Sequence, residues 1–281
     1  MRLFGSKNVE LLACVADTHC NSTIGLCPRR VPLDDGGDYS ASPAQRATWR
    51  AWGRFWDRAQ TLKAEYDTRL TVVVDGDALD HPKHATTQVA SWNRADILNI
   101  AAQTFDRPRQ LADAFYVLRG TEAHTGGNGE LEELLADDLD ATRDEKTGLA
   151  SWWWLPLHLG GVTFDIAHHP QTSSRRPWTR GSAAARQAAI TWSEYCLAGK
   201  KPPDVVLRGH VHYYADSGTT LPTRCFFLPP WQITTAFGHR LGAGGMVEPV
   251  GGMFFLCAGG EYHPLPLRYA PKVRAPVKVP V

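Results

Sequence analysis

The sequence predicts a protein of the α/β class, because short apolar runs alternate with amphipathic helical stretches along most of its 281 residues. The β-branched run 71–74 is typical of a buried strand. Ser42 predicts the start of a helix, since Gln45 completes a capping box and apolar residues then recur at three- and four-residue spacing. Two glycines at 160–161 separate two apolar segments and predict a β-hairpin.

In the first half of the chain, three short apolar runs predict buried strands, because each one stops at a polar cluster. These runs are 11–16, 70–74 and 115–118. Residues 20–41 are rich in Gly, Pro, Asp and Ser and predict a long surface loop. Helices are expected at 43–66, 87–104, 108–112 and 130–139. The aromatic stripe of the first helix is predicted to pack in the core, and the acidic residues of the last one to form a solvated face.

In the second half, the two glycines at 160–161 predict a hairpin of strands 151–159 and 162–167, and its tryptophan-rich first part is expected to be packed on both faces. A helix at 183–197 is expected to stop before Gly199. Further strands are predicted at 204–207, 225–228 and 253–257. The tail from about residue 264 holds five prolines, so we expect it to lack a regular strand ladder.

Residues 1–281 are expected to form a single domain, because no linker divides them. A hydrophobic fraction of 43% argues against a mostly disordered chain. Lys and Arg number 30 against 29 Asp and Glu, so no global charge favours nucleic acid or a membrane surface. No apolar run approaches the ~18 residues of a membrane span. The six cysteines form no C-x-x-C pair and are expected to be reduced. We therefore expect a cytoplasmic protein without membrane contact, and the oligomeric state stays open.

Five of the predicted strands end in clusters that contain His, Asp or Glu. A single His after a strand is more often a surface or packed residue, but α/β folds build their sites at strand ends, and five such clusters in order indicate one. Imidazole and carboxylate groups together suit Zn, Fe and Mn. The clusters are Asp17-Thr18-His19, Gly76-Asp77-Ala78-Leu79-Asp80, Gly120-Thr121-Glu122-Ala123-His124, His168-His169-Pro170 and Gly209-His210-Val211-His212.

This series resembles the calcineurin-like metallophosphoesterases, whose motifs run D-x-H, G-D-x-x-D, G-N-H-[DE], a lone His and G-H-x-H. The resemblance covers about two thirds of the chain, from Asp17 to His212. It implies a four-layer α-β-β-α sandwich with two mixed β-sheets, and a centre of two divalent transition-metal ions (Mn, Fe, Zn or Ni). It further implies that one ion is held by Asp17, His19 and His212, the other by His168 and His210, with Asp77 bridging the two and Asp80 orienting a ligand.

The third motif departs from the family pattern, because no Asn follows Gly120. Either Thr121 or Glu122 takes its place, and we expect Glu122 as the ligand because a carboxylate binds metal more strongly than a hydroxyl. His124 stands two positions beyond the place of the family's catalytic His and is its expected counterpart.

The resemblance implies hydrolysis of a phosphate monoester or diester by a water or hydroxide that bridges the two metals. His124 is expected to protonate the leaving oxygen. Arg175 and Arg176 are expected to bind substrate phosphate, with a solvated loop as the alternative. Two other functions stay open, a nuclease that acts on DNA or RNA and a non-catalytic scaffold. The scaffold is less favoured, because such proteins lose ligands and this chain keeps at least six.

Overall fold

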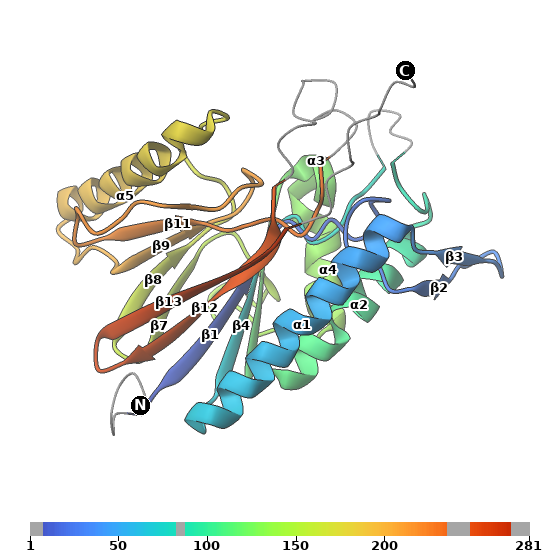
Figure 1. The fold of residues 1–281 in the computed structure, drawn as a ribbon, viewed down its shortest axis with the longest axis horizontal. Coiled ribbons are helices and arrows are strands. Elements are labelled where there is room, and N and C mark those ends of the chain that lie inside the picture. Colours follow the sequence, from blue (N-terminus) through green and yellow to red (C-terminus); the bar gives the residue numbers. More distant parts are fainter. Residues whose placement is uncertain (1–7, 83–87, 235–247, 271–281) are drawn as a thin grey trace, which may run out of the picture.

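The computed structural model describes residues 8–82, 88–234 and 248–270. Two β-sheets lie face to face, and helices cover the outer face of each (Figure 1). The fold is therefore the expected α/β sandwich of four layers. Both sheets are mixed, because each combines a parallel centre with antiparallel edge strands.

The first sheet has six strands in the order β13-β12-β1-β4-β5-β6. Strands β1, β4, β5 and β6 are parallel, and β12 and β13 complete the sheet in antiparallel fashion. Their bounds are Glu10–Val15 (β1), Leu70–Asp75 (β4), Ala114–Leu118 (β5), Ser151–Trp152 (β6), Val250–Ala258 (β12) and Glu261–Tyr269 (β13).

The second sheet has five strands in the order β10-β11-β9-β8-β7, of which β8, β9 and β11 are parallel. Their bounds are Leu155–Leu159 (β7), Val162–Ile166 (β8), Val205–Arg208 (β9), Ala215–Asp216 (β10) and Arg224–Phe227 (β11). A small hairpin of β2 (Arg30–Pro32) and β3 (Asp38–Ser40) lies within the segment predicted to be a surface loop.

Three helices pack on the first sheet, and one packs on the second (Figure 1). They are α1 (Pro43–Tyr66), α2 (Arg94–Leu111) and α4 (Glu130–Asp138) on the first sheet and α5 (Arg180–Leu197) on the second. Three short elements lie in loops: α3 (Glu122–Thr125), η1 (Gly127–Gly129) and η2 (Pro177–Thr179). Among the helices of the described ranges, none has both the length and the apolar composition of a membrane span.

The alternation of side chains along β1 divides the core into two parts. Leu12 and Cys14 face the second sheet and pack in the layer between the sheets. Leu11, Ala13 and Val15 point the other way, into the layer beneath the helices. Because successive strand residues point to opposite faces, one wholly apolar strand supplies both layers.

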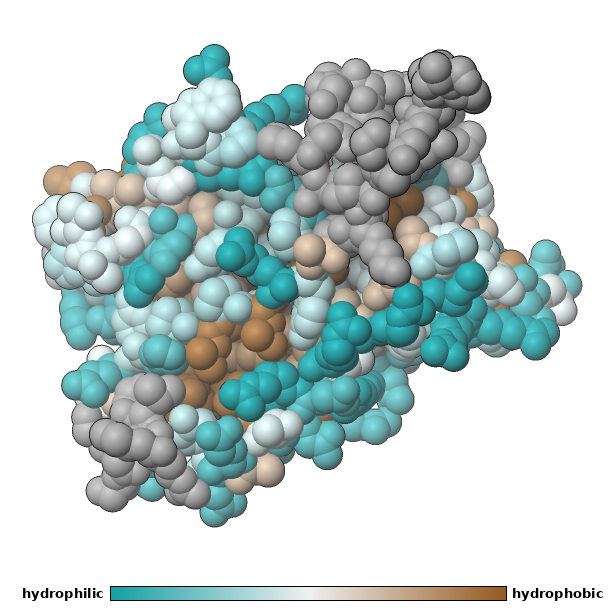
Figure 2. All heavy atoms as spheres, in the orientation of Figure 1, coloured by the Kyte–Doolittle hydropathy of each residue, from teal (hydrophilic) through white to brown (hydrophobic). Residues whose placement is uncertain are grey.

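Helix α1 begins as predicted, with a reciprocal capping box between Ser42 and Gln45. Its aromatic stripe is buried, and Trp52 and Phe55 are at most 3% exposed. Figure 2 shows the outer face of this helix as a hydrophilic band beside a hydrophobic area over β12 and β13. The stripe is therefore core, as the spacing indicated.

Helix α2 differs from the prediction, because it starts later, at the Asn93 cap, and continues through Pro108 as one helix. Proline has no N–H to donate to the carbonyl four residues earlier. That carbonyl, of Thr104, instead accepts a hydrogen bond of 3.2 Å from the indole of Trp52. A side chain of the neighbouring helix thus satisfies the group that Pro108 leaves without its usual partner.

Two predictions are wrong, one for the proline-rich tail and one for the tryptophan-rich strand. Residues 264–269 belong to β13, which pairs with β12 along its whole length despite Pro264 and Pro266. An edge strand tolerates proline because one side of its backbone needs no partner. The strand expected over 151–159 breaks after Trp152, so that Trp153 and Trp154 are 53% and 46% exposed rather than packed on both faces. The remainder of the proline-rich tail, residues 271–281, lies outside the described residues.

Candidate metal centre

The predicted ligands come together where the loops after five parallel strands meet, at the same end of the sheets as α3 (Figure 1). The loops after β1 and β4 run side by side beyond the sheet. Asp17 N–H donates to the Gly76 carbonyl at 3.1 Å, and His19 N–H donates to the Asp77 carbonyl at 2.9 Å. Backbone hydrogen bonds alone thus hold the first two motifs side by side.

Two glycines let these loops approach one another closely. Gly76 has φ +68°, and a Cβ there would lie 2.5 Å from the ring of His168. A Cβ on Gly120 would lie 2.2 Å from the Asp77 backbone nitrogen and from its Oδ1. Any larger residue at either position would displace a predicted ligand. This explains why glycine precedes Asp77 and Thr121.

The backbone is left-handed at five of the predicted ligands. The φ angles are 53° at Asp17, 43° at His19, 48° at Asp77, 69° at His210 and 54° at His212. Residues other than glycine adopt this region rarely and at a cost of about 1–3 kcal/mol each, and such strain clusters at functional sites. The concentration of strain at these five positions is an observation independent of the sequence motifs.

The first group of ligands is Asp17, His19 and His212. The two Nε2 atoms of the histidines are 3.1 Å apart, and Asp17 Oδ1 lies 3.2 Å from His212 Nε2 and 3.9 Å from His19 Nε2. Atoms bound to one transition-metal ion at about 2.0–2.2 Å are separated by roughly 3–3.5 Å. The group therefore fits a single ion.

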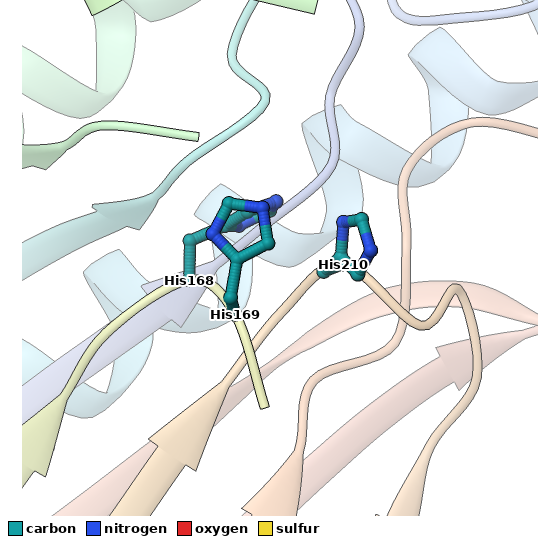
Figure 3. Close-up of side chains that lie close together, drawn as sticks. All are labelled: His168, His169 and His210. Carbon is teal, nitrogen blue, oxygen red and sulfur yellow. The ribbon is translucent and has the colours of Figure 1, made fainter. Parts of the chain in front are cut away.

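The second group surrounds the hydroxyl of Thr121. Thr121 Oγ1 lies 3.2 Å from Asp77 Oδ2, 3.1 Å from His169 Nε2 and 3.2 Å from His210 Nδ1. His168 Nε2 lies 3.1 Å from the same Asp77 oxygen. Figure 3 shows His168 and His169 after β8 and His210 after β9, which brings three imidazole rings together. His169 was not expected among the ligands.

The surroundings of His168 show whether a cation fits within the second group. Its Nδ1 donates to the Asp75 carbonyl at 2.6 Å, so the lone pair of the neutral ring is on Nε2. That Nε2 is buried without a hydrogen-bond partner, although it lies beside the Asp77 carboxylate. A buried lone pair next to a carboxylate is the arrangement that a divalent ion satisfies. The donor set therefore fits transition-metal ions.

Opposite charges in the centre shift several pKa values. Burial alone would raise the pKa of Asp77, but the charge of His168 and its contact with the carboxylate hold it well below the usual range. Burial would likewise lower the pKa of His168, whereas the Asp77 charge raises it well above its ordinary value. Burial and the neighbouring His168 and His169 lower the pKa of His210 to about 4. His210 is thus the neutral base that a metal requires.

Asp80 connects the centre to His124. Its Oδ1 accepts from His19 Nδ1 at 2.9 Å and from His124 Nδ1 at 2.6 Å. Burial would raise the pKa of Asp80, but the charge of His19 and the hydrogen bond from His124 lower it. The side chain of His124 is 37% exposed, and its ring contacts the ring of His19 edge-on at 4.6 Å. The structure thus places a solvent-accessible histidine beside the first ligand group.

Other predicted residues lie outside these groups. Glu122 is exposed at the start of α3, and none of the possible metal-binding groups in the described part of the chain contains it. The structure therefore brings Thr121, but not Glu122, together with the other predicted ligands. Arg175 and Arg176 are exposed and line a separate cavity beyond the His168–His169 loop.

Glu132 supports the loops of the candidate centre and was missed by sequence reasoning, because the acidic side chains of its helix were expected to form a solvated face. It is fully buried and accepts from the backbone N–H of Ala78 at 3.0 Å and of Gly120 at 2.5 Å. Burial and the charge of Asp77 raise its pKa to about 8. The only sequence signal is its spacing, since Glu132 shares a helix face with the buried Leu135 and Ala136.

Comparison with known proteins gives structural similarity alone. No protein-family model and no curated protein sequence matches the chain. Among solved structures, a hypothetical protein from Pyrococcus horikoshii OT3 is similar at 9% identity and a TM-score of 0.44, over 92% of this chain and 88% of that one. A dimetal phosphatase from Danio rerio is similar at 8% identity and a TM-score of 0.44, over 92% and 96%. At identities and TM-scores this low, the function has to be inferred from the side chains of the metal centre.

Proposed function

We propose that the protein hydrolyses a phosphate ester at a centre of two divalent transition-metal ions. The observation that carries this proposal is the convergence of two ligand groups on neighbouring points, with Asp17 Oδ1 3.9 Å from His168 Nε2 and Asp77 Oδ2 4.0 Å from His19 Nε2. Ions a few ångströms apart, about 3.5–4 Å, are typical of two-metal hydrolysis of phosphate esters.

One ion would be held by Asp17, His19 and His212. The other would be held by His168 and His210, with Asp77 between the two. Thr121 is the better candidate than Glu122 for the remaining position, because its hydroxyl already lies within 3.2 Å of Asp77 and His210. His169 lies 3.1 Å from the same hydroxyl and is available to either the ion or the substrate.

Two divalent ions would supply Lewis-acid stabilisation of the phosphoryl oxygens and would lower the pKa of water to near neutrality. The protein's own part is to fix the geometry. Asp80 accepts from His19 and so orients that ring, and the Asp75 carbonyl does the same for His168. Glu132 anchors the backbone at Ala78, directly after Asp77, and at Gly120, directly before Thr121.

His124 is suited to donate the proton that the leaving group needs. In hydrolysis, water oxygen forms a new bond to phosphorus, the ester P–O bond breaks, and the released oxygen takes up a proton. Asp80 accepts a hydrogen bond from the Nδ1–H of His124 at 2.6 Å, and Nε2 of this 37% exposed ring is the nitrogen that we propose exchanges a proton with the substrate. The Asp80–His124 pair is therefore the proposed general acid.

The decisive experiment strips the protein of metal and reloads it separately with Mn, Fe, Zn and Ni. Bound metal is measured by elemental analysis, and turnover is measured with monoester, diester, cyclic nucleotide and DNA substrates. We expect close to two ions per chain and metal-dependent hydrolysis. Asp77→Asn should weaken both ions, while Asp106→Asn, the same change on the exposed face of α2, should leave binding unchanged.

Two results would contradict the proposal. A maximum of one ion per chain after reloading would refute the two-metal centre. Two ions without turnover of any of these substrates would refute hydrolysis and indicate a metal-binding scaffold.

A further inference from the structure

A second polar site lies next to the metal centre but is separate from it. The loop after β8 leads from His169 to a cavity of about 520 Å³. Three arginines, Arg175, Arg176 and Arg186, line it together with Ser174, Thr179 and two further serines. All seven residues carry hydrogen-bond donors, and no acidic side chain lines the cavity. Such a lining suits a phosphate group.

The three arginines are not neutralised within the described residues. None of the ion pairs in ranges 8–82, 88–234 and 248–270 includes Arg175, Arg176 or Arg186. The neighbouring Arg180, in contrast, pairs with Glu248 at 2.6 Å. The chain as a whole carries a formal charge of only +1, so this cavity concentrates positive charge that the rest of the surface balances.

An exposed tryptophan stands beside the arginines. Trp178 lies in η2, two residues after Arg176, and is 78% exposed. It is the most exposed tryptophan of the described residues, so its indole presents an aromatic surface to solvent. A cationic surface with an adjacent aromatic face is how proteins bind single-stranded nucleic acid, with the phosphates on the cations and a base stacked on the ring.

The position of the cavity fits a strand that also reaches the metal centre. Tyr213 directly follows His212, and its hydroxyl accepts from Ser174 N–H at 2.8 Å. His169 and Ser173 are four residues apart, which spans at most about 14 Å of extended chain. Neighbouring phosphates of one strand can therefore reach both the cavity and the proposed ligands. The Ser174–Tyr213 hydrogen bond and the short segment 169–173 connect the two places.

We infer that the substrate is single-stranded nucleic acid, which binds the cavity through a phosphate other than the scissile one and stacks a base on Trp178. This inference rests on the proposed hydrolysis. A phosphodiester within the strand takes up one water, so that one new end keeps the phosphate and the other becomes a hydroxyl. A duplex keeps its bases stacked inside and cannot use the indole in this way.

Binding is measured apart from turnover. The full-length protein is titrated in excess EDTA against fluorescent oligo-dT and oligo-U of about 12 nucleotides, a length that one site covers. Trp178→Ala should weaken binding about 5- to 140-fold, the loss of one stacked base, while Trp178→Phe should retain most of the affinity. Arg175→Ala/Arg176→Ala should make the slope of log K against log salt less negative by about 1.4, at about 0.7 for each lost phosphate contact.

The matched control is Arg50→Ala/Arg58→Ala, which removes the same charge from the exposed face of α1 and should not change the slope. Oligonucleotide binding that Trp178→Ala does not weaken would overturn the inference. So would equal affinity for a duplex, for heparin, or for a mononucleotide. Turnover of a small diester by protein that does not bind oligonucleotides would overturn this inference alone. Oligonucleotide binding by protein that never hydrolyses an ester would refute the proposed function and, with it, the assignment of the strand as substrate.

Discussion

Glu132→Ala is expected to destabilise the fold strongly, although both hydrogen bonds that its carboxylate accepts come from backbone N–H groups. The substitution leaves the N–H groups of Ala78 and Gly120 buried without an acceptor. Each buried unsatisfied donor costs about 1–3 kcal/mol, so the free energy of unfolding should fall by about 2–6 kcal/mol. Glu132→Gln keeps one acceptor oxygen and should lose about half as much.

Equilibrium urea unfolding in EDTA measures this difference without a contribution from bound metal. The control is Glu130→Ala on the same helix, where the side chain is 60% exposed and its carboxylate pairs with Arg94. Exposed pairs contribute at most about 1 kcal/mol, so this variant should stay close to wild type. If Glu132→Ala is no less stable than Glu130→Ala, the two backbone hydrogen bonds do not hold the loops as we describe.

Glu132 also predicts how stability depends on pH. Its pKa is raised from the usual 4.5 to about 8 in the fold, by burial and by the charge of Asp77. Between these values the folded chain keeps a proton that the unfolded chain releases, so the free energy of unfolding falls as pH rises from about 4.5 to about 8. The contribution is at most about 1.4 kcal/mol per pH unit. In metal-free protein the fall should be smaller for Glu132→Gln, and parallel curves would contradict the assignment.

Three further predictions concern the metal centre. Thr121→Ala should loosen one of two bound ions in elemental analysis while Glu122→Ala leaves both, and the reverse result would restore Glu122 as the ligand. His124→Ala should reduce turnover of an alkyl phosphate ester about 10²–10⁴-fold, because a poor leaving group needs a proton, with a much smaller loss on a nitrophenyl ester and unchanged metal content. Equal losses on both esters would indicate that His124 positions phosphate instead. Because Asp77 raises the pKa of His168, an incoming ion must displace a proton there. Metal affinity of the apoprotein should therefore still rise with pH above the ordinary imidazole pKa of 6.5, and a calorimetric titration that finds a constant affinity there would contradict this.

Much of the fold could be predicted from the sequence because its signals are local. The capping box at Ser42, the β-branched run of β4 and the glycines at 160–161 each act through neighbouring residues, and the structure confirms all three elements. Strand β13 could not be predicted in this way. Its prolines argue against a ladder, and only its position at the edge of the sheet makes them acceptable.

The site shows the same division between local and distant information. The motifs predicted that Asp17, His168 and His212 would meet, because strand ends of parallel sheets lie together. Chemical strength favoured Glu122 over Thr121, but the helical turn of α3 exposes the carboxylate and leaves the hydroxyl beside Asp77. Glu132 acts on loops from two other parts of the chain, which no pattern in its own helix reveals.

The left-handed backbone at the ligand positions has a consequence for how such a centre is lost over time. His210 is exposed and has φ 69°, a conformation that glycine adopts without strain. A change from His210 to Gly would remove a ligand and at the same time relax the chain, so the inactive protein would fold at least as well as the active one. Selection for folding alone would therefore not keep a histidine at this position.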